Sequence, residues 1–429
     1  MLFFMLDIKF IRENVELVKE NMSKKNREDL NIVDDVLGLD SEWRKLKYKE
    51  DSLRSERNKI SEDIGAKKKA GESAEKEMEM AKEIPGKIAA VQEKRKKLEV
   101  KIRGIMMKIP NIMDASVPLG KDDSENVEIA KFGDNVVPDF EIPHHADIAA
   151  SLGGLDLESS RRTSGHGFYF MKGAVAQLHS AILTYARDFM VKKGYEYCVP
   201  PVMIRKDVVE GVQSFEETDS MMYKIEGEDL YLVGTSEHSM IGMFSGQTLQ
   251  DKSLPRKITG YSTCFRKEKG EHGIEEKGIY RVHQFEKQEM VVICRPEESF
   301  GLYDEMLGCT VEFFESLGVP CRTLEICSGD LGDLKVKSAD VEAWSPRRKE
   351  YFEVGSCSNL TDAQARRLNI KVDSGKERYF AHTLNNTVVA SPRALIAVLE
   401  NFYCEDGSVV VPEVLVGYMG GAEKIERKV

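Results

Sequence analysis

Apolar residues near the start of the chain recur at alternating spacings of three and four, which is the pattern of a coiled-coil seam. One such seam lies at residues 40–69, another at residues 81–105, and the polar segment 70–73 separates them. We therefore expect two long helices that fold back as an antiparallel coiled-coil hairpin over residues 40–105. Pro85 and Gly86 fall inside the second helix and predict an interruption with a kink, because proline removes a backbone hydrogen bond. The seam positions are Trp43, Leu46, Leu53, Ile60, Ile64, Ala81, Ile84, Ile88, Val91, Leu98, Ile102 and Ile105.

The rest of the chain shows shorter patterns, some typical of helices and some typical of strands. Residues 110–140 mix Pro, Gly, Asp and Ser with little periodicity, which indicates a linker. An amphipathic helix is expected at 173–192 and a short strand at 195–199, and strand patterns dominate from 258 until a closing helix near 391–403. Because strands and helices do not alternate strictly, we predict an α+β protein. Its expected parts are a helical domain at 1–109, the linker, and a domain at 141–429 with an antiparallel β-sheet flanked by helices.

Charge changes the interpretation of the helical hairpin. The 429 residues carry a formal net charge of -11, so the chain as a whole is not basic. Residues 40–105 nevertheless hold nineteen Lys or Arg against fourteen Asp or Glu, and Lys67, Lys68 and Lys69 lie at the expected tip. A positive arm suits phosphate groups, although a solvated helix surface explains any single lysine equally well.

Composition also bears on the compartment. Eight cysteines occur without a Cys-x-x-Cys pair or a Cys/His cluster, so we expect reduced thiols and no structural zinc. The apolar opening at 1–5 is too short for a signal peptide or a membrane span. These features predict a cytoplasmic protein with no membrane association.

Alternation along a strand expected at 258–268 places polar and small residues on one face. Gly260, Ser262, Cys264, Arg266 and Glu268 share that face. Three small side chains leave space above the sheet, and a cation and a hydrogen-bond acceptor lie at its end. This arrangement favours a bound nucleotide.

A loop at 269–278 that contains three glycines leads to a second expected strand. Arg281, His283, Phe285 and Glu289 share one face of this strand. A charged and aromatic face is not typical of a core. The alternative interpretation is a salt-bridged hairpin open to water.

The start of the closing helix has an unusual charge. Ser391 is expected to be its N-cap and Pro392 to lie in its first turn. Arg393 would then oppose the helix dipole, unless an anion binds beside it. A phosphate site is one interpretation, and an ordinary surface arginine is the other.

Together these segments resemble the signature motifs of class II aminoacyl-tRNA synthetases, specifically seryl-tRNA synthetases, from about Met5 to Gly421. Residues 265–268 and 281–289 resemble motif 2, and residues 385–401 resemble motif 3. Residues 234–237 resemble the serine-binding loop, and residues 353–359 resemble the segment that meets ATP and its metal. Residues 194–201 resemble motif 1, which forms the dimer in this family.

The resemblance implies ATP as a substrate and gives several residues a role toward it. Arg266 would bind the α-phosphate, Glu268 the adenine amino group, Phe285 the adenine face and Arg393 the γ-phosphate. Arg266, Arg393 and Glu353 are the implied catalytic residues. The implied ATP-binding residues are Arg266, Lys267, Glu268, Arg281, Val282, Phe285, Glu353, Val354, Gly355, Ser356 and Arg393.

The resemblance also implies Mg²⁺ and a serine pocket. Glu353 and Ser356 would hold the Mg²⁺ that accompanies ATP. A pocket whose buried groups need the substrate hydroxyl would reject alanine, and threonine would have to be excluded by lack of space. The implied serine-binding residues are Thr235, Ser236, Glu237, Glu289, Asn385 and Thr387.

The implied activity is a serine–tRNA ligase that makes seryl-adenylate and passes serine to the 3′ end of tRNA(Ser), with tRNA(Sec) as an open second substrate. Lys67, Lys68 and Lys69 would contact the tRNA, and the enzyme would be a homodimer. One alternative is a relative that loads a carrier protein, but that group lacks the arm and has zinc ligands. The other is an inactive RNA-binding paralogue, which the intact Arg266 and Arg393 argue against.

Overall fold

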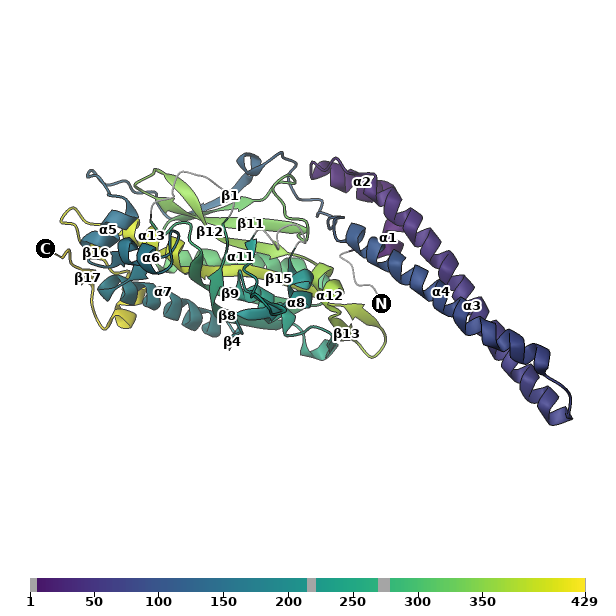
Figure 1. Cartoon of the computed structure of the whole chain (residues 1–429). Coiled ribbons are helices and arrows are strands. Elements are labelled where there is room, and N and C mark those ends of the chain that lie inside the picture. The colour runs from purple at the N-terminus through teal and green to yellow at the C-terminus, as the bar shows by residue number, and fades with distance from the viewer. Residues whose placement is uncertain (1–5, 214–220, 269–277, 429) are drawn as a thin grey trace. The chain divides into compact units, whose positions relative to one another are not determined.

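The computed structural model describes residues 6–213, 221–268 and 278–428 (Figure 1). Most of the glycine-containing loop at 269–278 lies outside these residues. The chain forms two compact units, one of residues 1–23 and 27–110 and the other of residues 24–26 and 111–429.

The N-terminal unit consists of helices α1 (Ile8–Glu13), α2 (Val15–Lys24), α3 (Ile32–Ala70) and α4 (Glu75–Met106). The long α3 and α4 lie side by side and are joined by a short turn (Figure 1). Side-chain hydrogen bonds join Trp43 to Glu99 and Lys67 to Glu77, so the two helices run in opposite directions. The predicted antiparallel hairpin is therefore confirmed, although its first helix begins eight residues earlier than the seam does.

The sequence predicts that Pro85 interrupts the second helix, but the structure shows no interruption there. Helix α4 is continuous from Glu75 to Met106 with Pro85 inside it. Ile84 and Ile88 on either side of the proline are buried against Ile60 of α3. Burial of these apolar side chains in the seam stabilises the helix on both sides of the missing hydrogen bond.

An eight-stranded sheet is the centre of the second unit. Its strand order is β1-β10-β11-β12-β15-β9-β8-β4, and every neighbouring pair is antiparallel except β4 with β8. This confirms the predicted α+β fold with a mainly antiparallel sheet. The strands, in sheet order, are β1 (Val127–Phe132), β10 (Cys321–Glu325), β11 (Lys337–Ser345), β12 (Glu350–Asn359), β15 (His382–Ala390), β9 (Gln284–Cys294), β8 (Arg256–Phe265) and β4 (Glu196–Cys198).

Helices cover the two faces of this sheet differently. Met290 and Val292 of β9 belong to the main apolar core, with helices α7 (Gly173–Lys192), α11 (Ser299–Ser316) and α13 (Ser391–Asn401). Val291 and Ile293 face the other way, into a smaller core with α10 (Ser236–Gly242) and α12 (Ala363–Leu368). The smaller core covers one end of its face, and the site described below occupies the rest.

Several elements differ from the sequence-based expectation. Strand β8 ends at Phe265 and β9 begins at Gln284, so Arg266, Glu268, Arg281 and His283 lie just outside the strands. The 18-residue helix α11 falls where strand patterns were expected to dominate. Strand β1 lies inside the stretch expected to be a linker and pairs with β10.

Smaller elements complete the second unit. None of the helices in the described ranges is both long and apolar enough to cross a bilayer. The remaining elements are η1 (Asp123–Glu125), α5 (His145–Ser151), β2 (Leu155–Asp156), α6 (Leu157–Thr163), β3 (Phe170–Met171), β5 (Met203–Arg205), α8 (Lys206–Val212), β6 (Leu230–Leu232), β7 (Thr248–Gln250), η2 (Asp251–Ser253), η3 (Pro296–Glu298), β13 (Lys371–Asp373), β14 (Arg378–Phe380), β16 (Val409–Val410), α14 (Glu413–Val416), η4 (Gly417–Met419) and β17 (Lys424–Ile425).

Candidate active site

The open face of β9 carries three functional side chains at alternate positions. Phe285, Lys287 and Glu289 pair across the ladder with Cys264, Ser262 and Gly260 of β8. The small residues of β8 thus lie beside the large residues of β9, as the alternation predicts. A cavity opens above Phe285 and Lys287.

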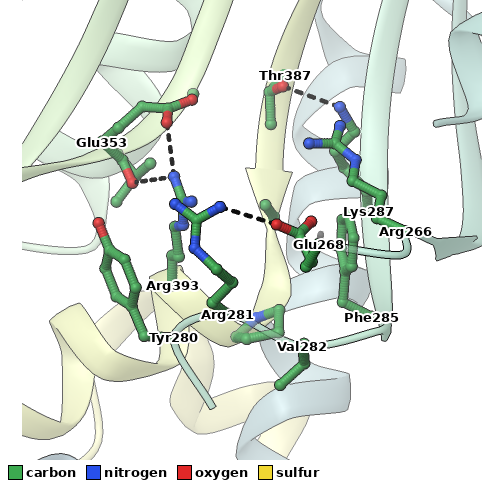
Figure 2. Close-up of a pocket in the computed structure, with 14 residues that line it drawn as sticks. Arg266, Glu268, Tyr280, Arg281, Val282, Phe285, Lys287, Glu353, Thr387 and Arg393 are labelled. Atoms are coloured by element: carbon green, nitrogen blue, oxygen red, sulfur yellow. Dashed lines mark hydrogen bonds and ion pairs between the residues drawn. The ribbon is translucent and has the colours of Figure 1, made fainter. Parts of the chain in front are cut away.

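Figure 2 shows how this first cavity is lined, and it brings together most residues to which the resemblance gives a role toward ATP. Phe285 and Lys287 come from β9, Glu353 comes from β12, and Arg393 comes from the first turn of α13. The lining residues are Arg266, Glu268, Tyr280, Arg281, Val282, Phe285, Lys287, Glu353, Val354, Gly355, Thr387, Ala390, Pro392 and Arg393.

Arg393 is held in place by both an anion and an aromatic ring. Its Nη1 donates to the Oε2 of Glu353 at 2.7 Å and to the backbone oxygen of Glu353 at 3.1 Å. Its guanidinium carbon lies 4.7 Å from the ring centroid of Tyr280. The charge of Arg393 holds the pKa of the Glu353 carboxyl below its usual range. A guanidinium fork that is already oriented and largely buried suits a phosphate ligand.

The sequence predicts that Ser391 is the N-cap of α13, and this prediction is wrong. Ala390 takes that position, and Ser391 is the first helical residue, with Pro392 next. The Ser391 hydroxyl instead lies 2.8 Å from the Nε2 of His179 in α7. The N–H groups of the first turn therefore have no side-chain cap from the cap residue, which leaves them available to an anion.

Arg266 lies where β8 ends and lines the first cavity and a second one. Its Nε donates to the backbone oxygen of Gly234 at 3.2 Å, and its guanidinium carbon is 5.4 Å from the Phe285 centroid. Glu268 follows in a left-handed conformation, with φ of 45°, and accepts a hydrogen bond from Arg281 at 2.8 Å.

The second cavity contains four of the six residues implied to bind serine. Thr235, Glu237, Asn385 and Thr387 line it, together with Ser356, which is implied to hold Mg²⁺. Arg266, Lys287, Glu353 and Thr387 line both cavities, so the two share a boundary.

Glu289 lies under the second cavity, fully buried, and organises three of the residues that line it. Its carboxylate is 2.5 Å from the Nζ of Lys287 and accepts hydrogen bonds from Thr235 at 3.2 Å and Asn385 at 3.3 Å. A charge buried to this degree requires such partners. Glu289 therefore fixes the polar groups of the cavity from below.

Glu237 is also buried and sits in the first turn of α10, after the cap residue Thr235. The Nε2 of Gln364 donates to its Oε1 at 2.8 Å, and the Oε1 of Gln364 accepts from Thr383. Burial and the nearby charge of Glu289 raise the pKa of Glu237 to about 7. A cationic ligand beside this carboxyl would stabilise its ionised form.

A bulge in β12 brings Glu353 to the same side as Ser356. The pairing with β11 shifts between Val341 and Glu342, so the two residues share a cavity despite their odd spacing. Asp340, opposite Ser356, has a raised pKa because of burial and the charge of Glu353. Mg²⁺ prefers hard oxygen ligands, and its positive charge would relieve the repulsion between the carboxylates of Asp340 and Glu353. No described cluster of three His, Cys, Asp or Glu could hold a metal alone, so ligand oxygens would have to complete the coordination.

Three of the implied ATP- and serine-binding residues are not among the described cavity linings, and Glu289, which lies under the second cavity, is one of them. The hydroxyl of Ser236 donates to the backbone oxygen of Gly260 at 3.0 Å, in the core under the site. The backbone N–H of Lys267 bonds to Met221, and its ammonium lies 6.0 Å from the Tyr223 ring centroid. Lys67, Lys68 and Lys69 belong to the other unit, in the last turn of α3.

Some residues of the site have no assigned role in the sequence analysis. Lys287 was detectable, because it shares its strand face with Phe285 and Glu289. Tyr280, Gln364 and Asp340 come from other segments, and no spacing in the sequence connects them to the motifs.

Comparison with known proteins agrees with this geometry. Residues 5–113 match the seryl-tRNA synthetase N-terminal domain, and residues 221–402 match the class II tRNA synthetase core domain (G, H, P, S and T). A serine–tRNA ligase of Methanocella arvoryzae is 43% identical over 423 residues, covering 98% of this chain and 100% of the relative.

Solved structures agree over the same extent. The seryl-tRNA synthetase of Pyrococcus horikoshii complexed with ATP superposes with a TM-score of 0.92 at 39% identity, covering 99% of this chain and 100% of that one. The cytoplasmic serine–tRNA ligase of Naegleria fowleri in complex with AMP gives 0.87 at 35% identity, with 99% of each chain covered. The chain therefore belongs to the seryl-tRNA synthetase family.

Proposed function

We propose that the chain is a serine–tRNA ligase that activates L-serine with ATP and transfers it to the 3′ end of tRNA(Ser). The observation that carries this proposal is the boundary between the two cavities. Arg266, Lys287, Glu353 and Thr387 line both of them. A nucleotide in the first cavity and an amino acid in the second would bring the carboxylate to the α-phosphate at that boundary.

In the first step, the serine carboxylate attacks the α-phosphorus of ATP, and pyrophosphate leaves. Arg266 contacts the α-phosphate from the boundary, and Arg393 holds the γ-phosphate, so both neutralise charge that develops in the transition state. Phe285 supports the adenine ring and Glu268 accepts from its amino group. Positioning supplies most of the rate, and no side-chain nucleophile is needed.

Glu353 and Ser356 would hold Mg²⁺, which would supply neutralisation of the negative charge on the phosphates. The Glu353 carboxylate also pairs with Arg393, and its side chain is 43% exposed, so it is open to the cavity. The pair thus keeps the cation and the carboxylate oriented for the phosphates.

The second cavity selects serine by matching each of its polar groups. Glu237 takes the ammonium group, and the hydroxyl meets Thr235 and Asn385, the polar groups that Glu289 organises. Alanine would leave these groups unpaired, which costs more than the loss of a contact in an apolar pocket.

We further propose that residues 1–109 are the tRNA-binding domain and that 110–140, which include the edge strand β1, link it to a catalytic domain at 141–429. Lys67, Lys68 and Lys69 would contact the tRNA backbone. RNA helices are read by shape and phosphate position, which a positive coiled coil suits. The enzyme would be a homodimer whose interface includes residues 194–201. It would act in the cytoplasm, and tRNA(Sec) is a second candidate substrate.

The test is ATP–pyrophosphate exchange with purified protein, Mg²⁺ and each of serine, alanine and threonine. We expect exchange with serine and a loss of at least about a hundredfold in kcat/KM with alanine. Equal exchange with alanine would contradict the proposed serine pocket, and exchange with a different amino acid alone would contradict the proposed substrate.

A further inference from the structure

A fully buried histidine lies behind the first cavity. His145 is the first residue of α5 and has no exposed surface. It is not among the described residues that line either cavity, and the motifs give it no role. Its ring lies between helix α13 and the segment that leads into β9.

The Nε2 atom of His145 accepts a hydrogen bond from the backbone N–H of Ile279 at 3.3 Å. Gly278, directly before, has φ of 101°, and a Cβ added there would lie 2.3 Å from the same Nε2. A side chain at residue 278 would therefore displace either the ring or the backbone. The backbone of Gly278 and Ile279 therefore packs closely against the imidazole of His145, a few residues before β9 begins.

A carboxylate lies on the opposite side of the ring. The Oε1 of Glu400, in α13, is 4.0 Å from the Nδ1 of His145. Glu400 is itself buried and is held by Arg347 at 2.8 Å and by the Ser345 hydroxyl. A negative charge on the Nδ1 side favours the proton on Nδ1, so that the lone pair of Nε2 accepts from Ile279.

The residues after Ile279 enter the first cavity. Tyr280, the next residue, carries Arg393 over its ring and packs edge-on against Phe352, with ring centroids 5.9 Å apart. Val282, two residues further, lines the same cavity. A shift of the backbone at Ile279 would therefore move both the support of Arg393 and the wall of the nucleotide site.

We propose that His145, with its tautomer set by Glu400, is a positioning residue that fixes the backbone at Gly278–Ile279 and thereby shapes the ATP site without touching ATP. The proposal rests on the function proposed above for this cavity. The proposal predicts an effect on ATP binding but not on serine binding. Thr235 and Glu237, which line the serine cavity, come from a different segment of the chain.

The test compares His145→Leu, which keeps bulk but removes the acceptor, with His145→Gln, which places an amide oxygen near the position of Nε2. In serine-dependent exchange, we expect His145→Leu to raise the KM for ATP about tenfold and to leave the KM for serine within about twofold. His145→Gln should restore most of the ATP affinity. His144→Leu is the matched control, because His144 accepts from Ala146 at the same helix terminus and should leave the KM for ATP unchanged.

The proposal is overturned if folded His145→Leu binds ATP normally, if the KM values for ATP and serine rise together, or if His145→Gln is as impaired as His145→Leu. If neither variant folds, Gly278→Ala decides, since its added Cβ should raise the KM for ATP and an unchanged value refutes the proposal. ATP is also titrated by calorimetry, which needs no turnover. Absence of exchange in the unaltered chain would then count against the proposed function, whereas the comparison of ATP dissociation constants still decides the role of His145.

Discussion

At the scale of single residues, Arg393 is the side chain on which adenylate formation should depend most. It is largely buried, oriented by Glu353 and Tyr280, and placed within the first turn of α13, whose N–H groups have no side-chain cap. We expect Arg393→Ala to lower serine-dependent exchange by at least about a hundredfold, because the negative charge on the leaving pyrophosphate would lose the cation that neutralises it.

Arg393→Lys is the control for that substitution, since it keeps the charge but not the fork. It should retain more activity than Arg393→Ala and less than the unaltered chain. Normal exchange in Arg393→Ala, with a melting temperature close to that of the unaltered chain, would show that the γ-phosphate is held elsewhere.

The pKa of Glu237, raised to about 7, predicts a pH dependence in serine binding. Below pH 7 the carboxyl is mostly neutral in the free enzyme and must lose its proton before it pairs with the serine ammonium group. The KM for serine should therefore fall about tenfold between pH 6 and pH 8, as the ionised fraction rises.

The KM for ATP serves as the internal control across the same pH series, because Glu237 is not among the described linings of the first cavity. Glu237→Gln should bind serine weakly at every pH and lose the slope. A slope that persists in Glu237→Gln would assign the titration to a different group.

Residue-level prediction succeeded where a periodic pattern carried the information. Phe285 and Glu289 share a strand face as the period of two requires, and Lys287 between them could have been included. Arg266 and Arg281 were assigned to strands that do not reach them, because the motif continues past the last ladder hydrogen bond. Gln364 could not be found, since its link to Glu237 depends on tertiary packing.

At the scale of secondary-structure elements, the helical hairpin contains a charged residue inside its seam. Glu50 of α3 is 1% exposed and accepts hydrogen bonds from Arg95 at 2.7 Å and Gln92 at 2.9 Å, both on α4. It also accepts from Arg54 one turn along its own helix. Such a network specifies the register of a coiled coil, because any slip leaves a buried charge unpaired.

We expect Glu50→Ala to destabilise the hairpin by about 1–3 kcal/mol, as Arg95 and Gln92 would lose their shared acceptor. Hydrogen exchange of α3 and α4 in the whole chain would measure the loss. Glu83→Ala is the matched control, because it removes an exposed carboxylate that pairs with Lys87 on the same hairpin and should change stability little. Equal exchange rates in both variants would contradict a structural role for Glu50.

The pH dependence of this network follows from the sign of the Glu50 pKa shift. Hydrogen bonds from Gln92 and Arg54 and the charge of Arg95 lower the pKa of Glu50. Its stabilising contribution is thus complete above the ordinary carboxyl pKa and is lost as the pH falls through the lowered value. Neutral conditions keep this contribution in full.

Element-level prediction was accurate where local periodicity determined the outcome. The bounds of α7 agree with the expected helix at 173–192, and the hairpin seam was readable from the spacing of its apolar residues. Helix α11 was missed although its pattern was readable. Met306, Phe313 and Phe314 are buried on one side, whereas Asp304, Glu305 and Glu312 are exposed on the other.

At the scale of the whole molecule, we expect the two compact units to divide the proposed work, with adenylate formation in the second unit and tRNA binding in the first. The described lining residues of both cavities belong to the second unit, whereas the tip lysines belong to the first. We expect that replacing residues 40–105 by a short turn will leave serine-dependent exchange near its normal rate and abolish tRNA charging. Loss of exchange together with charging, in a protein that still folds, would contradict this division.

A milder variant keeps the hairpin intact. Lys68 and Lys69 are exposed in the last turn of α3, whereas Lys67 is paired with Glu77. Lys68→Ala with Lys69→Ala should weaken tRNA binding and reduce its dependence on salt concentration, without changing exchange. Lys96→Ala with Lys101→Ala, two exposed positions on α4 away from the tip, is the matched control. Equal effects of the two double variants would contradict a specific role for the tip.

The most direct test of the central claim is the charging of tRNA(Ser) with labelled serine, run beside serine-dependent ATP–pyrophosphate exchange on the same preparation. A serine–tRNA ligase gives both activities, and both depend on ATP, Mg²⁺ and serine. Exchange without charging would contradict the claim in favour of a ligase for a different acceptor, and absence of both would indicate a paralogue that keeps the fold without the chemistry.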